Sequence, residues 1–403
     1  MARRDLALPE FVALMALIFA TLAFSIDAML PAFPAIAAEL SPDAPNQVQL
    51  ILSLFMAGMG IGTFFTGPLS DATGRLPVIY GGFFIYLIGS VLAHYAPTLE
   101  TLLAARFLQG LGASGPRIVS MAMMRDLHEG RRMAQITSFV MTVFMLVPAV
   151  APWLGQFIID SFGWRAIFAA YVLFALFVAG WIFLRQAETH PRERRRPFTL
   201  KGYLSGAKEV LSRRDVVLII IVLSFGFGQM FALLSATQQI YDQTYGQGAN
   251  FPKWFMATAA FSAVTTVLNG ALVMRLGMRR IALAAYLFQI GFSALVLAVF
   301  WFKLVPQPFE LWLYFTWSVS LFFMAGLTFG NLNALALQPL GHMAGMGASL
   351  VGAISTVLAV VIAAPISLSF SGTPVPMIIG TVVCSTLAYL LLRLVGTGEP
   401  QGH

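Results

Sequence analysis

The chain has 403 residues, of which 59% are apolar and only 10% charged, and its mean hydropathy is +0.82. Soluble domains carry about a quarter charged residues, so this composition excludes a soluble globular fold and indicates that the lipid bilayer is the solvent. The formal charge of +7 does not indicate nucleic-acid binding, because the basic residues flank apolar runs. A single cysteine, Cys384, excludes a disulfide framework or a cysteine metal cluster, and we assign it to packing.

Twelve apolar stretches are each long enough, at about 20 residues, to cross a bilayer as a helix. They lie at roughly 11–34, 48–69, 77–95, 99–124, 134–159, 165–185, 216–240, 254–275, 279–302, 311–335, 345–369 and 375–393. The first stretch follows Arg3 and Arg4, but it is too long for a secretory signal and contains Asp27, so we interpret it as a retained span.

The lysines and arginines predict the orientation of these spans. If the N-terminus lies inside, 19 of the 24 fall in inner loops and termini, three in outer loops, and two within a span. Inner loops of membrane proteins carry an excess of Lys and Arg. We therefore expect a multi-pass protein of the bacterial inner (plasma) membrane with both termini cytoplasmic.

The longest hydrophilic stretch divides the predicted spans into two groups of six. We expect an N-terminal half at 1–185, a cytoplasmic linker at 186–215 that touches anionic lipid, and a C-terminal half at 216–403. The loop at 67–75 has a weaker counterpart at 270–280, in the corresponding place of the second half. Such internal repeats are typical of transporters whose binding site lies between the repeats near the midplane.

Three charged residues fall well inside predicted spans. Asp27 is the only acid so placed, and Arg106 and Arg117 are the only bases. The two arginines are eleven residues apart, which is close to three helical turns, so they lie on one face about 16 Å apart in depth. Pro116 should bend the helix between them. Charges at this depth are functional candidates, because exposing them to lipid is costly.

Asp27 and Arg106 should lie at similar depth. Each is seven residues from the outer end of its span, or about 10 Å. They would meet if the first and fourth spans are neighbours. Two interpretations stay open for the pair: a carboxylate that exchanges a proton during transport, or a static ion pair that fixes two helices.

Weaker candidates lie in the second half. Gln229, Gln238, Asn331 and Asn333 are polar groups that could line a substrate cavity together with Asp27 and Arg117, although hydrogen bonding between helices explains such residues equally well. No cluster has metal-ligand spacing, no phosphate-binding loop is present, and no nucleophile–base arrangement is discernible. We therefore expect no metal, no cofactor and no enzymatic activity.

The loop from Gly67 to Arg75 resembles a signature of the major facilitator superfamily, and it matches at Gly67, Leu69, Asp71, Gly74 and Arg75. We expect this gating loop to make a tight turn. Asp71 should accept hydrogen bonds from exposed backbone N–H groups at the positive end of a neighbouring helix. The resemblance implies an all-α membrane protein with twelve helices in two pseudo-symmetric halves.

Two further segments resemble motifs of the same superfamily. Arg106 to Gly112 resembles its fourth-helix motif, which implies that Arg106 takes part in proton coupling. Residues 148–155 resemble the antiporter motif of drug exporters, with Pro148, Pro152 and Gly155 in place but Gln156 where a second glycine is common. These residues should bend the fifth span and allow close packing against the other half, as a hinge, a leak seal or an ordinary kink.

Finer resemblance is to the Bcr/CflA group of drug:proton antiporters, carried by residues 27–34, 124–127, 138–141 and 342–345. It implies proton-coupled export of small amphipathic drugs by alternating access, with Asp27 as proton carrier and Arg106 as its partner. Arg117 is outside this pattern. Together, the charges of Asp27, Arg106 and Arg117 in the cavity favour neutral or zwitterionic substrates. The alternatives are a proton-linked carrier for a metabolite such as a sugar, amino acid or anion, and a membrane-embedded enzyme or receptor. We expect a monomer whose partners are drugs, protons and lipid.

Overall fold

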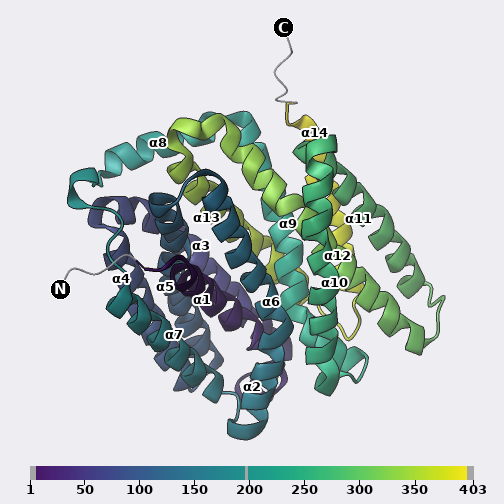
Figure 1. Cartoon of the computed structure of the whole chain (residues 1–403). Helices are drawn as coiled ribbons and strands as arrows, with labels where there is room; N and C mark the ends of the chain where they lie inside the picture. Colours follow the sequence, from purple (N-terminus) through teal and green to yellow (C-terminus); the bar gives the residue numbers. More distant parts are fainter. Residues whose placement is uncertain (1–5, 196–197, 397–403) are drawn as a thin grey trace. The chain divides into compact units, whose positions relative to one another are not determined.

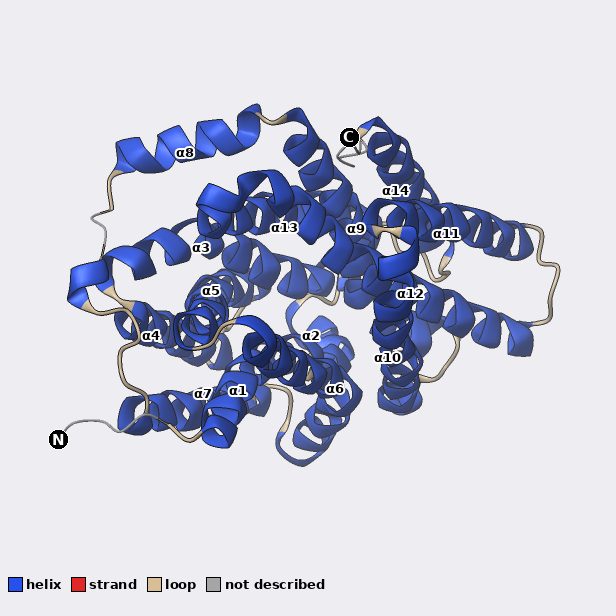
Figure 2. Cartoon of the chain, turned by 45° about the horizontal axis from the view of Figure 1, so that its top comes forward, coloured by secondary structure: helices blue, strands red, loops and turns tan. Residues whose placement is uncertain are grey.

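The computed structural model describes residues 6–195 and 198–396, and every regular element in these ranges is a helix (Figure 2). The chain divides into two compact units (Figure 1). The first comprises Met1–Tyr203 and Gly246–Ala259, and the second comprises Leu204–Tyr245 and Ala260–His403. The predicted boundaries of the halves and the linker stay predictions.

The helices of the first unit follow the first six predicted spans. They are α1 (Leu8–Asp27), a 3-10 turn (Leu30–Ala32), α2 (Phe33–Leu40), a second 3-10 turn (Pro45–Gln49), α3 (Leu50–Thr73), α4 (Arg75–His94), α5 (Leu99–Leu127), α6 (Gly130–Phe162) and α7 (Ala166–Arg185). A short 3-10 turn (Arg192–Arg194) and α8 (Leu200–Ser212) occupy the region predicted as a linker.

The second unit contains the other six long helices. They are α9 (Arg214–Gln239), which continues into a π-helical turn (Ile240–Thr244), α10 (Phe251–Leu276) after a 3-10 turn (Gly248–Asn250), α11 (Met278–Trp301), α12 (Gln307–Leu337), α13 (Ala344–Leu368) after a 3-10 segment (Gln338–Met343), and α14 (Val375–Leu394). The first residues of α10 belong to the first unit and the rest to the second.

Eleven helical segments in the described part of the chain are long and apolar enough to cross a membrane. The remaining predicted span, 99–124, corresponds to α5, a helix of 29 residues. Arg106 and Arg117 lower its hydropathy, but α5 packs against α3 and α4 along its length, so protein rather than lipid covers much of its surface. Twelve long helices are therefore present, as predicted, and the most polar of them is an interior helix.

Glycines allow α5 to approach its neighbours backbone to backbone. A Cβ atom on Gly110 would lie 1.9 Å from the carbonyl oxygen of Phe55 in α3, and one on Gly112 would lie 2.3 Å from the amide nitrogen of Tyr86 in α4. No larger residue fits at either position without moving a helix. This close packing fixes the depth and rotation of the arginines that α5 carries.

The first predicted span, 11–34, is interrupted, which corrects the expectation of one continuous helix. α1 ends at Asp27, and the chain continues through the 3-10 turn into α2. Pro31 has no N–H to donate to the carbonyl of Asp27 four residues earlier, so the hydrogen-bond ladder stops there. Asp27 consequently lies at a helix end inside a longer membrane-crossing segment, Leu8–Leu40.

Candidate functional site

Asp27 is buried at the end of α1 with no compensating charge. Its exposed fraction is 5%, and no hydrogen bond or ion pair of its side chain is found within the described ranges. Directly after it, the carbonyl oxygen of Ala28 lies 2.0 Å from where a Cβ atom on Gly155 of α6 would stand. The structure therefore places α6 against the backbone that follows Asp27.

Arg106 is one of the largest fully buried side chains, with an exposed fraction of 1%. Its guanidinium donates to the carbonyl oxygen of Ser25 at 3.0 Å and to the side-chain oxygen of Gln109, and it lies 4.3 Å from the ring centroid of Phe55. This bond shows that α1 and α5 are neighbours, which is the condition on which a pair of Asp27 and Arg106 depended. The predicted direct pair is not formed in this conformation, because Arg106 binds the backbone two residues before Asp27.

Further polar groups extend from Arg106 through the interior of the first unit. The hydroxyls of Ser25 and Tyr86 share a hydrogen bond of 2.5 Å, and Tyr171 donates to the carbonyl of Ser25 at 3.3 Å. Gln109 donates to Ser90 at 2.8 Å. This arginine network (Ser25, Tyr86, Ser90, Arg106, Gln109 and Tyr171) joins α1, α4, α5 and α7. Among its members, only Arg106 was predicted from the sequence. The position of Gln109 one turn later on the same helix could have indicated that the two side chains meet.

Arg117 differs from Arg106 in its surroundings. It is half-buried, and its recorded hydrogen-bond partner is the sulfur of Met59 at 3.8 Å, a weak acceptor. No described carboxylate is within ion-pair distance of it. Met59 is one turn after Phe55 on α3, so both arginines turn toward the same helix, as the spacing predicted. Arg117 therefore makes fewer and weaker hydrogen bonds than Arg106 and keeps more of its N–H donors available.

The predicted gating loop forms a charged cluster that we call the loop clasp (Asp71, Arg75, Asp126 and Glu188). Arg75 binds Asp71 at 2.5 Å and Asp126 at 2.8 and 3.2 Å, which joins the ends of α3, α4 and α5. Gly74 adopts a φ of +106°, which explains the glycine at this turn. Gly67 lies on the last turns of α3, where its carbonyl accepts from Ser70 at 2.8 Å.

The expected role of Asp71 belongs to Glu188. The carboxylate of Glu188 accepts from the first two backbone N–H groups of α4, those of Arg75 and Leu76, at 2.9 and 3.0 Å. It therefore satisfies the positive end of that helix, whereas Asp71 pairs with Arg75. Sequence analysis missed Glu188 because it lies more than a hundred residues away, in the region predicted as a linker.

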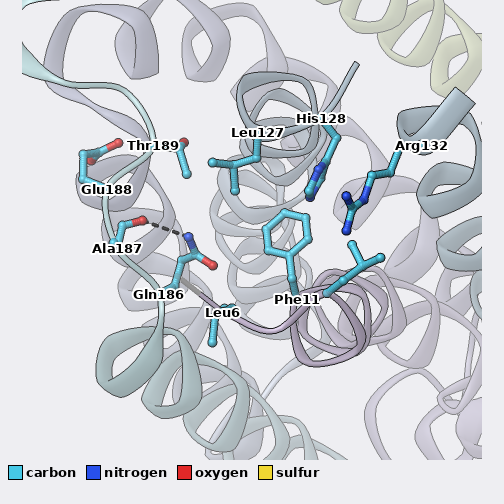
Figure 3. Close-up of a pocket in the computed structure, with 10 residues that line it drawn as sticks. Leu6, Phe11, Leu127, His128, Arg132, Gln186, Ala187, Glu188 and Thr189 are labelled. Atoms are coloured by element: carbon cyan, nitrogen blue, oxygen red, sulfur yellow. Dashed lines mark hydrogen bonds between the residues drawn. The ribbon is translucent and has the colours of Figure 1, made fainter. Parts of the chain in front are cut away.

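A pocket of about 260 Å³ lies beside the loop clasp (Figure 3). Phe11, His128 and Arg132 lie on one side of it and Gln186 to Thr189 on the other. The ring of His128 meets Phe11 edge-on at 5.5 Å. Burial, and then the charge of Arg132, lower the pKa of His128 below its ordinary value.

A larger, apolar groove of about 620 Å³ lies between α1, α6 and α7. Phe24 lines it one helical turn before Asp27. The other lining residues are Ala20, Val143, Leu146, Val147, Val150, Ala151, Leu154, Ala170, Leu173, Phe174 and Phe177. Its size is in the range of small-molecule sites.

The four candidates of the second unit differ in how far their polar atoms are satisfied. Asn331 donates to Asn269 at 2.7 Å, Asn333 donates to its own helix at Phe329, and the side-chain oxygen of Gln229 accepts from Ser385 at 2.9 Å. The bonds of Asn331 and Gln229 join neighbouring helices, which favours the alternative of hydrogen bonding between helices, whereas the bond of Asn333 stays within α12. Gln238 is buried, and its side-chain oxygen has no hydrogen-bond partner within the described ranges.

Gly155 of the antiporter-like motif makes a close contact within its own unit, with Ala28, the residue that follows α1. The expected packing of this motif against the other half stays a prediction. Pro148 and Pro152 both lie inside the continuous helix α6. The motif therefore shapes the packing of α6 against the end of α1, next to Asp27.

Residues 14–364 match the family model described as Major Facilitator Superfamily. A bicyclomycin resistance protein homologue from Haemophilus influenzae is 30% identical over 379 residues, which is 92% of each chain. The multidrug resistance protein MdtL from Shigella flexneri is 35% identical over 166 residues, covering 41% of this chain and 42% of its own. Among solved structures, a D-xylose–proton symporter matches with a TM-score of 0.73 at 14% identity, over 97% of this chain and 98% of its own.

Proposed function

Because the chain belongs to the Major Facilitator Superfamily, a family of multi-pass membrane transporters, we propose that it is a proton-coupled antiporter that exports amphipathic small molecules by alternating access. The relatives named for bicyclomycin and multidrug resistance support drug export as its direction and cargo. The observation that carries the proton coupling is the buried, unpaired carboxyl of Asp27. We propose the bacterial inner membrane as its location, with both termini cytoplasmic.

Asp27 is suited to exchange a proton against substrate. A buried carboxylate without a counter-ion is costly, whereas the neutral acid is accommodated more easily. Asp27 lies at the end of α1, where the chain turns into a 3-10 segment and Pro31 cannot donate to the backbone carbonyl of Asp27. In the proposed cycle, protons reach Asp27 from the outer side and displace substrate that entered from the inner side.

Arg106 acts on Asp27 through the backbone rather than by direct pairing. It holds the carbonyl of Ser25, two residues before Asp27, and so couples the rotation of α5 to the end of α1. This arrangement makes Arg106 a positioning residue in the present conformation. A direct contact with Asp27 would then belong to another state of the cycle.

Two features support the proposed substrate class. The groove beside α1 is lined by aliphatic and aromatic side chains, and Arg117 has donors for a carbonyl or an anionic group. We therefore propose neutral or zwitterionic amphiphiles as the cargo. In the second unit, Gln238 keeps a buried amide oxygen and Gln229 a buried amide nitrogen without a hydrogen-bond partner in the described ranges, so both stay candidates for substrate contacts. Asn331 and Asn333 are weaker candidates because Asn269 and Phe329 already bind them.

The alternative is a proton-linked carrier for a specific metabolite, with the two arginines as an anion clamp. The contacts of Arg106 weaken it, because its guanidinium is enclosed by Ser25, Gln109 and Phe55. A comparison of uptake into inverted vesicles, with anionic metabolites and hydrophobic drugs in parallel, separates the two. Saturable transport of the metabolite alone would favour the carrier.

Asp27→Asn tests the proposed function. In proteoliposomes with an imposed proton gradient, the variant should lose uphill transport of a drug while its drug affinity stays within about threefold of the unchanged protein. Asp43→Asn is the matched control, because Asp43 is an exposed acid in the loop after α2. Drug susceptibility of cells that express each variant, with and without a protonophore, gives the cellular readout. Uphill transport by Asp27→Asn would refute the proton-carrier role.

A further inference from the structure

The short helix α8 has an apolar stripe that no described part of the chain covers. Leu200, Leu204 and Leu211 are 63%, 57% and 43% exposed. At about 100° per residue they fall within an arc of about 40°, so they form one line along the helix. An aligned row of exposed leucines on a 13-residue helix is costly in water.

A second face of α8 packs against the protein. Gly206 and Val210 are buried, and the sulfur of Met346 in α13 lies 2.3 Å from where a Cβ atom on Gly206 would stand. This face is about 80–120° from Leu200 around the helix. The contact with α13 fixes the rotation of α8, so the leucine stripe is held outward.

A third face carries positive charge. Lys201 and Lys208 are both exposed and lie about 80–100° from Leu200, on the side away from Gly206. Glu209 is on the far side of the helix from the stripe. The lysines therefore border the leucines on one edge, an arrangement that suits a helix lying in the surface of an anionic membrane.

We propose that α8 lies in the surface of the inner leaflet, with its leucine stripe at the acyl boundary and Lys201 and Lys208 on the headgroups of anionic phospholipids. Two observations favour a lipid surface over a protein partner. α9 begins at Arg214 directly after α8 and is long and apolar enough to cross the membrane, so α8 is continuous with a candidate membrane span. The lysines also match the negative charge of that leaflet.

The test measures the depth of α8 in bilayers of defined charge. In a Cys384→Ala background, which removes the only cysteine, Leu204→Cys carries a spin label and the full chain is placed in nanodiscs. Accessibility to oxygen and to a water-soluble nickel reagent then reports depth. Ser205→Cys is the matched control, since Ser205 is exposed and outside the stripe. The label at 204 should be lipid-exposed and that at 205 water-exposed when phosphatidylglycerol is present.

Neutralising the lysines distinguishes lipid recognition from simple burial. Lys201→Gln with Lys208→Gln should lower the inserted population of α8 by about fivefold for each lysine in phosphatidylglycerol nanodiscs, and Lys→Arg at both sites should restore it. A label at 204 that is water-exposed in every bilayer overturns the proposal. Insertion of α8 that is independent of lipid charge and of both lysines also overturns it. So does shielding of the label that persists in detergent and depends on protein concentration, because this would indicate contact with a second copy of the chain.

Discussion

At the scale of single residues, three buried charges have three different environments. The guanidinium of Arg106 contacts backbone, amide and aromatic groups, although its Nε is buried without a hydrogen-bond partner. Arg117 keeps most of its donors, and Asp27 has no side-chain partner in the described ranges. Charges are retained at membrane depth where function requires them. The environment of each side chain therefore distinguishes Arg106, which positions the end of α1, from Asp27 and Arg117, which have fewer partners.

Gln109 should contribute strongly to the stability of the first unit. Gln109→Leu removes its bonds to Arg106 and Ser90 and leaves both groups buried without that partner, which should lower the free energy of unfolding by about 1–3 kcal/mol. Thermal unfolding in detergent measures the loss. Gln47→Leu, at an exposed position, should change it little. An unchanged melting temperature for Gln109→Leu would show that the arginine network does not stabilise the fold.

At the scale of helices, close packing of backbones decides where charges lie. α5 fits between α3 and α4 only because glycines stand at the contacts, and α6 approaches the end of α1 at Gly155. At the other end of the same helices, the loop clasp ties α3, α4 and α5 to residues after α7. The first unit is thus fixed near Asp27 by packing and at the clasp by charge.

Gly155→Ala should disturb the end of α1. The added methyl would lie 2.0 Å from the carbonyl of Ala28, so a helix must move, and overpacking of this kind costs about 1–3 kcal/mol. Transport should fall with stability, because the displaced backbone carries Asp27. Gly180→Ala in α7 is the matched control, since a methyl there would meet nothing within 4 Å. Equal stability and transport of the two variants would contradict the packing role.

At the scale of the whole molecule, the described residues form twelve long helices in two units. Eleven of them belong to segments apolar enough to cross a membrane by composition, and the twelfth, α5, is more polar and is enclosed by its neighbours. The membrane-crossing fold is shared with transporters of low sequence identity. We propose cytoplasmic termini on the basis of charge, because 19 of the 24 basic residues fall on one side of the predicted topology.

Cysteine labelling tests this orientation. In the Cys384→Ala background, a membrane-impermeant thiol reagent applied to intact cells should label Asp43→Cys in an outer loop. It should label Ser205→Cys in α8 only after the inner membrane is permeabilised. Both positions are exposed, so access alone decides the result. The reverse pattern would invert the proposed topology.

Composition and pattern were enough to predict the class of protein, the number of long helices and the unusual charges at 27, 106 and 117. These properties depend on transfer free energy and helical period, which are local to each segment. The similar depths of Asp27 and Arg106 were also predicted, because depth along a span can be counted from its ends, but depth does not indicate which spans are neighbours.

Only the tertiary structure decided which groups those charges meet. Arg106 binds the carbonyl of Ser25, 81 residues away, rather than Asp27, and Glu188 instead of Asp71 satisfies the start of α4. Gly155 contacts Ala28 within its own unit. Every non-proline backbone offers the same donors and acceptors whatever its side chain. A sequence pattern therefore cannot reveal which carbonyl or N–H group a distant side chain will reach once glycines have allowed two helices to touch.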